Sequence, residues 1–142
     1  MIAVGEDKKI NIISIIDDDI VYQVLASKII RSTELVSEIM QFYDGEEALD
    51  YFQKNVENSS AWPEIIFLDL NMPYMDGWQF LKEFAERGFH GKGLSTIYIV
   101  SSSNSEIDKQ KAKEFSEVTG YYIKPVLKED YLKIFGDHLR SY

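Results

Sequence analysis

Residues 65–77 read IIFLDLNMPYMDG, an apolar run that ends in an aspartate and passes into a polar turn. The four residues from Ile65 to Leu68 are apolar without alternation, which is typical of a strand covered on both faces in a parallel sheet. Asp69 follows directly, and the segment from Asn71 to Pro73 is typical of a turn. Asp76 then stands where a helix would need its N-cap. The stretch therefore predicts a buried strand, a loop and a helix, with a carboxylate where the strand ends.

Apolar runs of this kind recur along the chain and alternate with segments of helical spacing. The runs expected as strands are residues 10–16, 37–42, 65–68, 96–100 and 120–123. Apolar side chains at three- and four-residue spacing follow each run: Val21, Val24, Leu25 and Ile29; Ala48, Leu49, Phe52 and Val56; Trp78, Leu81, Phe84 and Ala85; Ala112, Phe115 and Val118; Tyr131, Leu132, Phe135 and Leu139. The fourth stripe is the weakest. Five strand–helix units predict a three-layer (βα)5 domain of the α/β class, with a doubly wound five-stranded parallel sheet.

Polar residues lie where the expected helices need N-caps, since a side-chain oxygen there accepts hydrogen bonds from free backbone N–H groups. The candidates are Asp19, Asp44, Asp76 and either Asn104 or Ser105. Three large aromatic residues have simpler interpretations. We expect Tyr22 and Trp78 to be packing residues of their helices, and Trp62 to anchor the polar loop before the third strand.

Length and composition limit the possible functions. The chain has 142 residues, 45% of them hydrophobic, which suits one packed core, and we expect residues 1–142 to form a single domain. A formal charge of −9 argues against nucleic acid or an anionic membrane surface as a partner, because both attract basic proteins. The lack of cysteine excludes disulfides and thiolate metal sites. Since the sequence shows no signal peptide and no apolar run of membrane-spanning length, a cytoplasmic location is expected.

Polar residues directly follow four of the five expected strands. Asp17, Asp18 and Asp19 follow the first, Asp69 and then Asn71 the third, Ser101, Ser102 and Ser103 the fourth, and Lys124 and Pro125 the fifth. Ligands of an open parallel sheet bind beyond the carboxyl ends of its strands, so these residues are candidates for a functional site. Each group alone has an ordinary interpretation as a solvated loop, a helix cap or a surface lysine. Their common position at one end of the sheet is what favours a function.

The carboxylates of Asp17, Asp18 and Asp69 converge if the first strand lies beside the third. At a separation of ~5 Å and an effective dielectric constant of ~20, each pair of charges repels by on the order of 3 kcal/mol. A divalent cation relieves such repulsion, and Mg²⁺ prefers carboxylate, carbonyl and phosphoryl oxygens. Lys124 and the hydroxyls of residues 101–103 complete a set of groups suited to phosphoryl transfer, in which catalysis is mostly positioning and charge neutralisation.

Four motifs occur together over nearly the whole chain. They are Asp17-Asp18 after Ile15-Ile16, the block from Leu68 to Gly77, Val100-Ser101-Ser102, and Lys124-Pro125. With these motifs the chain resembles the receiver domains of the response-regulator family of two-component signalling, and the block around Asp69 is the most specific of the four. The resemblance implies a flavodoxin-like receiver fold with strand order 2-1-3-4-5. It also implies a protein that accepts a phosphoryl group, not an enzyme that turns over an external substrate.

The resemblance assigns a phosphoacceptor and a metal site. Asp69 corresponds to the phosphoacceptor, and Lys124 is expected to pair with the phosphoryl oxygens. Mg²⁺, or alternatively Mn²⁺, is the implied cofactor. Asp18 is expected to bind it directly, Asp17 largely through a metal-bound water, and Asn71 through its backbone carbonyl, with Asp69 as a further ligand.

The resemblance also implies a switch. Ser101 corresponds to the hydroxyl that moves to the phosphoryl group, and it replaces the threonine that is commoner in the family. Tyr121 corresponds to the aromatic residue that turns inward with it. Asn71 and Ser103 flank the expected path of the hydrolytic water and are expected to tune the lifetime of the acyl phosphate.

The implied partners are a sensor histidine kinase or a histidine phosphotransfer protein as phosphodonor, and a downstream protein target. We expect a stand-alone receiver that signals through protein contact, with a phosphoryl shuttle in a phosphorelay as the alternative. A phosphatase of the haloacid dehalogenase type also uses a strand-end aspartate and Mg²⁺, but it needs a second aspartate where Asn71 stands. A flavin binder would carry its phosphate loop after the first strand, whereas the serines follow the fourth. A docking module that is never phosphorylated leaves the full set of site residues unexplained.

Overall fold

The computed structural model describes residues 8–141, and its core is a five-stranded parallel sheet in the order β2-β1-β3-β4-β5. The strands are β1 (Ile10–Ile16), β2 (Val36–Phe42), β3 (Ile65–Leu68), β4 (Thr96–Ser101) and β5 (Val118–Ile123). The α-helices are α1 (Ile20–Ser32), α2 (Gly45–Lys54), α3 (Gly77–Glu86), α4 (Glu106–Ala112) and α5 (Lys128–Arg140), and two 3₁₀ turns are η2 (Ser59–Ala61) and η3 (His90–Lys92). The predicted (βα)5 architecture and strand order are confirmed.

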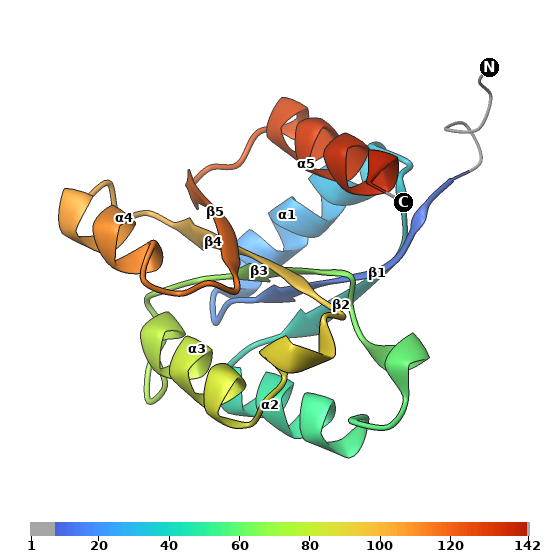
Figure 1. The fold of residues 1–142 in the computed structure, drawn as a ribbon. Helices are drawn as coiled ribbons and strands as arrows, with labels where there is room; N and C mark the ends of the chain where they lie inside the picture. The colour runs from blue at the N-terminus through green and yellow to red at the C-terminus, as the bar shows by residue number, and fades with distance from the viewer. Residues whose placement is uncertain (1–7, 142) are drawn as a thin grey trace.

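The sheet lies between two layers of helices. Figure 1 shows α1 and α5 on one face of the sheet and α2 and α3 on the other. The four residues of β3 explain the apolar run without alternation. Ile65 and Phe67 belong to the core under α1 and α5, whereas Ile66 and Leu68 belong to the core over α2 and α3. Because successive side chains of a strand point to opposite faces, a strand buried on both faces needs an apolar residue at every position.

The predicted N-caps hold the starts of the first four helices. The side chains of Asp19, Asp44 and Asp76 accept hydrogen bonds from backbone N–H groups in the first turns of α1, α2 and α3, and Asp76 forms a capping box with Gln79. Ser105, rather than Asn104, caps α4. These caps fix where each helix begins after the loop that carries the polar residues of the sheet edge.

The stripe expected to mark the fourth helix does not belong to one helix. The helix α4 ends at Ala112, Phe115 lies in the turn that follows, and Val118 is the first residue of β5. All three side chains nevertheless pack against the same core, the one over α2 and α3. A shared core, and not a helical repeat, therefore produces their three-residue spacing.

The strand predicted at residues 120–123 is also too short, because β5 begins at Val118 and not at Gly120. Its pairing with β4 shifts register between Ile97 and Tyr98, so Ile97 lies opposite Val118 and Tyr98 opposite Gly120. An ideal Cβ built on Gly120 would come within 3.0 Å of the Tyr98 ring. A glycine at this point therefore leaves room for the Tyr98 ring.

Two tryptophans occupy different parts of the fold. Trp62 anchors its loop as predicted, since its Nε1 donates a 2.7 Å hydrogen bond to the Asn55 carbonyl and its ring stacks on Phe52 at 4.7 Å. Trp78 on α3 stacks instead on Phe115, with ring centroids 5.8 Å apart. Trp78 therefore lies against the segment that leaves α4.

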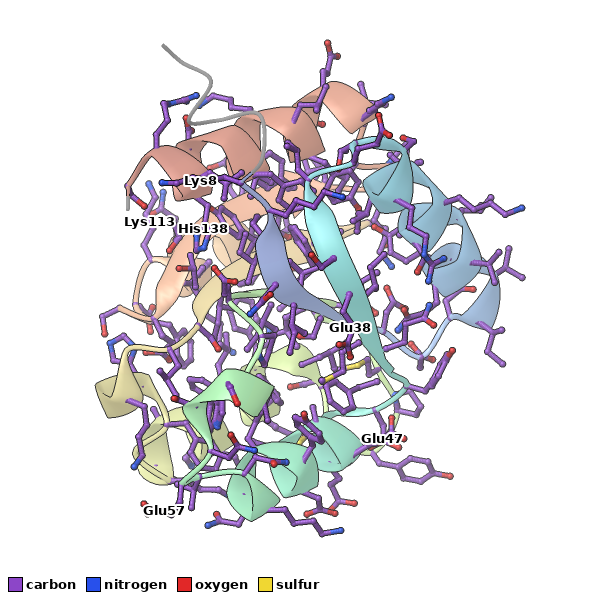
Figure 2. The ribbon with its side chains drawn as sticks, turned by 90° about the vertical axis from the view of Figure 1, so that its right-hand side faces the viewer. Lys8, Glu38, Glu47, Glu57, Lys113 and His138 are labelled. Atoms are coloured by element: carbon purple, nitrogen blue, oxygen red, sulfur yellow. The ribbon has the colours of Figure 1, made fainter. Side chains whose placement is uncertain are left out.

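Polar contacts hold the amino end of the sheet, and Figure 2 labels one of the residues that make them, His138. His138, labelled there on α5, lies with Nε2 2.9 Å from Glu64 Oε1, while Glu64 Oε2 accepts a 2.8 Å hydrogen bond from Asn11 N. Glu38, also labelled, lies exposed on the edge strand β2, where a charge disfavours pairing with another sheet edge. No helix within residues 8–141 has the length and apolar character needed to cross a membrane.

Candidate functional site

Two carboxylates lie side by side at the carboxyl edge of the sheet. β1 pairs with β3 so that Ile16 lies opposite Leu68, which makes the next residues, Asp17 and Asp69, neighbours across the two strands. The backbone also joins them, because Asp69 N donates a 3.0 Å hydrogen bond to the Ile16 carbonyl. Asp17 is 2% exposed and Asp69 5%, whereas Asp18 is exposed. The sheet therefore buries two acidic groups next to each other and leaves the third at the rim.

Lys124, at the end of β5, supplies the positive charge of this crevice. Its Nζ donates a 2.7 Å hydrogen bond to Asp17 Oδ2 and lies 3.5 Å from Asp69 Oδ1. Its backbone N–H donates to the Ser101 carbonyl at 2.9 Å, which ties the ends of β4 and β5 together. Burial lowers the pKa of Lys124, but the hydrogen bond to Asp17 and the charges of Asp69 and Asp17 outweigh that effect and raise it. Lys124 therefore keeps its positive charge in this crevice.

Asp69 is the most perturbed carboxyl group of the crevice. Burial, and then the charge of Asp17, raise its pKa from 3.8 to about 6. Lys124 and the backbone N–H of Asn71 act in the opposite direction without cancelling the rise. A carboxylate that stays poorly neutralised beside a lysine has unused affinity for a further cation.

The acidic cluster is suited to a hard divalent metal ion. One carboxylate oxygen from each of Asp17, Asp18 and Asp69 lies within 4.8 Å of the other two. The three donors are all oxygen atoms, the ligand type that Mg²⁺ and Mn²⁺ favour. Asn71 is two residues beyond Asp69 in the loop before α3, and its side chain is exposed. The donor set therefore fits a metal ion in contact with the buried carboxylates.

A chain of hydrogen bonds links the crevice to α4. Ser101, fully buried, accepts a 3.1 Å hydrogen bond at Oγ from Ser103 N. The Ser103 carbonyl accepts a 2.8 Å hydrogen bond from the hydroxyl of Tyr121. The Ser103 hydroxyl donates a 2.6 Å hydrogen bond to Asp108 Oδ2. The loop after β4 is thus connected both to α4 and to β5.

The backbone around Asp69 requires a glycine at position 77, within the sequence block from Leu68 to Gly77. An ideal Cβ built on Gly77 would lie 2.7 Å from the Asp69 carbonyl oxygen and 2.8 Å from Leu70 Cα. Both neighbours are backbone atoms, which cannot move aside as a flexible side chain would. Gly77 N also donates a 2.9 Å hydrogen bond to the Leu70 carbonyl. The start of α3 therefore packs directly on the strand end that presents Asp69.

Two residues of the site were not predicted from the sequence. The ring of Tyr22, expected only to pack its helix, lies under Lys124 Nζ at 4.1 Å from the ring centroid. Gln23, fully buried, donates through Nε2 to the carbonyls of Ile15, Asp17 and Phe42. The position of both residues in the first turn of α1, directly after the acidic residues, was the available signal.

Comparison with known proteins agrees with this geometry. The family model described as the response regulator receiver domain matches residues 13–135. The crystal structure of a two-component response regulator from Cytophaga hutchinsonii is 30% identical, has a TM-score of 0.85, and is matched over 95% of this chain and 100% of that one. The chemotaxis protein CheY4 of Vibrio cholerae is 28% identical with a TM-score of 0.70, over 91% of this chain and 98% of that one.

Curated relatives include regulatory proteins of several lengths. The probable methanogenesis regulatory protein FilR2 of Methanothrix harundinacea is 26% identical over 131 residues, which are 92% of this chain and 82% of that protein. The nitrate/nitrite response regulator NarL of Escherichia coli is 29% identical over 121 residues, 85% of this chain but only 51% of NarL, so the chain spans about half the length of that relative. Because the family model covers most of the chain, including all the crevice residues, the chain belongs to the response-regulator receiver family of two-component signalling.

Proposed function

We propose that the chain accepts a phosphoryl group on Asp69 from the phosphohistidine of a sensor histidine kinase or a histidine phosphotransfer protein. A carboxylate oxygen of Asp69 forms the new bond to phosphorus, the P–N bond of the donor breaks, and its electron pair stays on the imidazole nitrogen. The observation that carries the proposal is the placement of Asp69, buried beside Asp17 with the Lys124 ammonium 3.5 Å away. We propose no turnover of an external substrate.

Lys124 and the carboxylates of Asp17 and Asp18 prepare this step. In the structure Lys124 shares its charge between Asp17 and Asp69. We propose that it pairs with phosphoryl oxygens when they arrive, because a phosphoryl group brings about −1.5 to −2 charge and strong acceptor oxygens. Asp17, Asp18 and Asp69, with the backbone carbonyl of Asn71, would hold Mg²⁺ or Mn²⁺. When bound, the metal ion supplies charge neutralisation to the phosphoryl oxygens.

The output of the switch follows from the hydrogen bonds of Ser101 and Ser103. We propose that the Ser101 hydroxyl turns to the phosphoryl group and gives up the hydrogen bond from Ser103 N, which now measures 3.1 Å. Ser103 then loses the contact with Ser101 that helps to fix its position. Its carbonyl accepts a hydrogen bond from Tyr121 and its hydroxyl donates one to Asp108, so both partners are affected. Phosphorylation would thus bias the loop, α4 and Tyr121 together toward a second arrangement.

This arrangement would be read by another protein, or the phosphoryl group would pass onward to a histidine of a relay protein. The position of Ser103 supports its proposed influence on the lifetime of the acyl phosphate, since its backbone N–H contacts the buried Ser101 hydroxyl while its own hydroxyl is held by Asp108. Asn71, two residues after Asp69, would share that influence. Mixing the phosphorylated chain with a histidine phosphotransfer protein separates an end-point receiver from a shuttle.

The proposal is tested by incubation with Mg²⁺ and either acetyl phosphate or a phosphorylated histidine kinase, followed by intact-protein mass spectrometry. We expect a gain of one phosphoryl group in the wild type and none in Asp69→Asn. Asp19→Asn is the matched control, because it changes a neighbouring aspartate whose role is to cap α1, and asparagine also caps well. Failure to label the wild type with every donor, or full labelling of Asp69→Asn, would contradict the proposal.

A further inference from the structure

Lys124 Nζ has three close neighbours, of which two are carboxylates and the third is an aromatic ring. Its Nζ lies 2.7 Å from Asp17 Oδ2, 3.5 Å from Asp69 Oδ1 and 4.1 Å from the ring centroid of Tyr22. A cation within about 6 Å of a ring centroid is attracted to the negative face of the ring. The ring therefore both limits the space open to the ammonium and favours its charge.

The ring of Tyr22 is itself held at both ends. At its backbone, Tyr22 N donates a 3.0 Å hydrogen bond to the N-cap Asp19, which fixes its place in the first turn of α1. At its tip, the Tyr22 hydroxyl interacts with Tyr131 on α5, and burial together with this neighbour raises the pKa of Tyr131. Tyr131 is 2% exposed and lies edge-on to Phe67 with ring centroids 5.4 Å apart. Tyr22 thus connects α1 to α5 on the same face of the sheet.

A lysine needs such a support more than an arginine would. Its ammonium is a point charge on a flexible four-carbon stem with freely rotating donors, so its position depends on the surfaces around it. The Lys124 side chain is 19% exposed, so the attraction of Asp17 and Asp69 alone does not close its path toward solvent. The Tyr22 ring supplies a third contact, since the ammonium lies over it at 4.1 Å from the ring centroid.

We propose that Tyr22 is a positioning residue for Lys124, whose ring holds the ammonium over the buried carboxylates where an incoming phosphoryl group must bind. The inference rests on the proposed function, because it assumes that Lys124 serves the phosphoryl oxygens on Asp69. The ring performs this task, and the hydroxyl only secures the ring to Tyr131. Tyr22→Phe therefore keeps the positioning surface, whereas Tyr22→Met, of similar length and compatible with a helix, removes it.

The first measurement needs no phosphorylation. The methylene protons next to Nζ of Lys124 lie near the face of the Tyr22 ring, so their NMR signal is expected upfield of those of the other lysines. The shift should persist in Tyr22→Phe and vanish in Tyr22→Met. A Lys124 signal at the ordinary lysine position in the wild type would overturn the inference whether or not Asp69 is phosphorylated.

The second measurement is the rate of phosphorylation by acetyl phosphate with Mg²⁺. In this reaction the Asp69 oxygen bonds to phosphorus, the bond from phosphorus to the acetyl oxygen breaks, and its electron pair leaves with acetate. Tyr22→Met is expected to slow the reaction about 3- to 30-fold, the range that the usual strength of a cation–π contact gives, and Tyr22→Phe to restore it. Val21→Ala, an exposed change in the same helical turn, should leave the rate unaltered.

A double-variant cycle separates positioning from general damage to α1. In a Lys124→Met background, Tyr22→Met should cause no further loss of rate, because its effect passes through Lys124. An equal loss in both backgrounds, or a wild-type rate in Tyr22→Met, would overturn the inference. A shifted Lys124 signal in a wild type that no donor phosphorylates would instead refute the proposed function and, with it, the catalytic purpose of the contact.

Discussion

Lys124 Nζ donates a 2.7 Å hydrogen bond to Asp17 Oδ2 across 107 residues of sequence. The contact joins the loop after β1 to the end of β5, on opposite sides of β3, and it places a cation within 3.5 Å of the central carboxylate, Asp69. Asp69 nevertheless keeps a raised pKa because burial and the charge of Asp17 outweigh the effect of Lys124. The two buried carboxylates therefore share a single lysine charge, which has consequences for stability, metal binding and phosphorylation.

Asp69→Asn should stabilise the protein at neutral pH. The pKa of Asp69 is raised from 3.8 to about 6 by burial and by Asp17, so between these values the folded state holds a proton that the unfolded chain has released. Raising the pH through this window therefore costs stability, on the order of 2–3 kcal/mol in total at about 1.4 kcal/mol for each pKa unit.

The measurement is the free energy of unfolding by urea, in the absence of divalent metal, from pH 3.5 to 8. We expect the wild type to lose stability relative to Asp69→Asn as the pH rises from about 4 to 6, and the difference to stay constant above that. Equal pH profiles for the two proteins would show that Asp69 does not titrate as the buried, uncompensated group described here.

Mg²⁺ should stabilise the wild type against unfolding by neutralising the same charges. A ligand that binds only the folded state contributes about 2.7 kcal/mol at a hundredfold excess over its Kd. The increase in Tm should be largest near pH 7.5 and decline below pH 6, because the pKa of Asp69 is about 6 and a proton then competes with the metal ion. Asp18→Asn removes one donor of the cluster and should weaken the effect. A Tm increase that is the same in Asp18→Asn would place the bound metal elsewhere.

Two buried serines, one in β1 and one in α1, should respond in opposite ways to substitution by alanine. Ser14, 0% exposed in β1, has a hydroxyl without a hydrogen-bond partner among the described residues, so Ser14→Ala should stabilise the fold by about 1 kcal/mol. Ser27, 2% exposed in α1, accepts a 2.9 Å hydrogen bond from Gln41 Nε2, and Ser27→Ala should cost about 1 kcal/mol. Urea unfolding decides the signs, and a loss of stability in Ser14→Ala would contradict the structure at that position.

Trp78 should report the movement of α4. Its ring stacks on Phe115, just beyond α4, and Lys111 Nζ of α4 lies 4.8 Å from the ring centroid. Beryllofluoride with Mg²⁺ mimics the phosphorylated state, and we expect it to change the tryptophan fluorescence. Trp78→Phe should abolish the change, whereas Trp62→Phe, deep in the core over α2, should retain it. An unchanged fluorescence in the wild type under saturating beryllofluoride would argue against displacement of α4.

Much of the fold and of the site could be predicted because both depend on local sequence. Strands covered on both faces need continuous apolar runs, and helices that follow them need caps, so Ile65–Leu68 and Asp76 were informative on their own. The sequence did not indicate the correct bounds of α4 and β5. Ala112 ends a helix, Phe115 lies in a turn and Val118 starts a strand. All three pack against one core, so their spacing resembles that of a helix.

The contacts that unite the site could not be read from sequence, because they join distant segments through side-chain geometry. The position of Tyr22 under Lys124 depends on the relative placement of α1 and the end of β5. The hydrogen bonds of Ser103 with Asp108 and Tyr121 likewise need the actual path of the loop after β4. The sequence indicates which residues reach the edge of the sheet, while packing decides which of them touch.

The most direct test maps the phosphorylated residue itself. The chain is phosphorylated with Mg²⁺ and a phosphodonor, the acyl phosphate is reduced with borohydride, and the modified residue is located by peptide mass spectrometry. We predict that residue 69 alone is converted to homoserine, because Asp69 is the buried carboxylate at the end of the central strand, β3, with Lys124 3.5 Å away. Conversion at position 17 or 18 in place of 69, or a stable label on a serine of the 101–103 loop, would contradict the assignment of Asp69 as the phosphoacceptor.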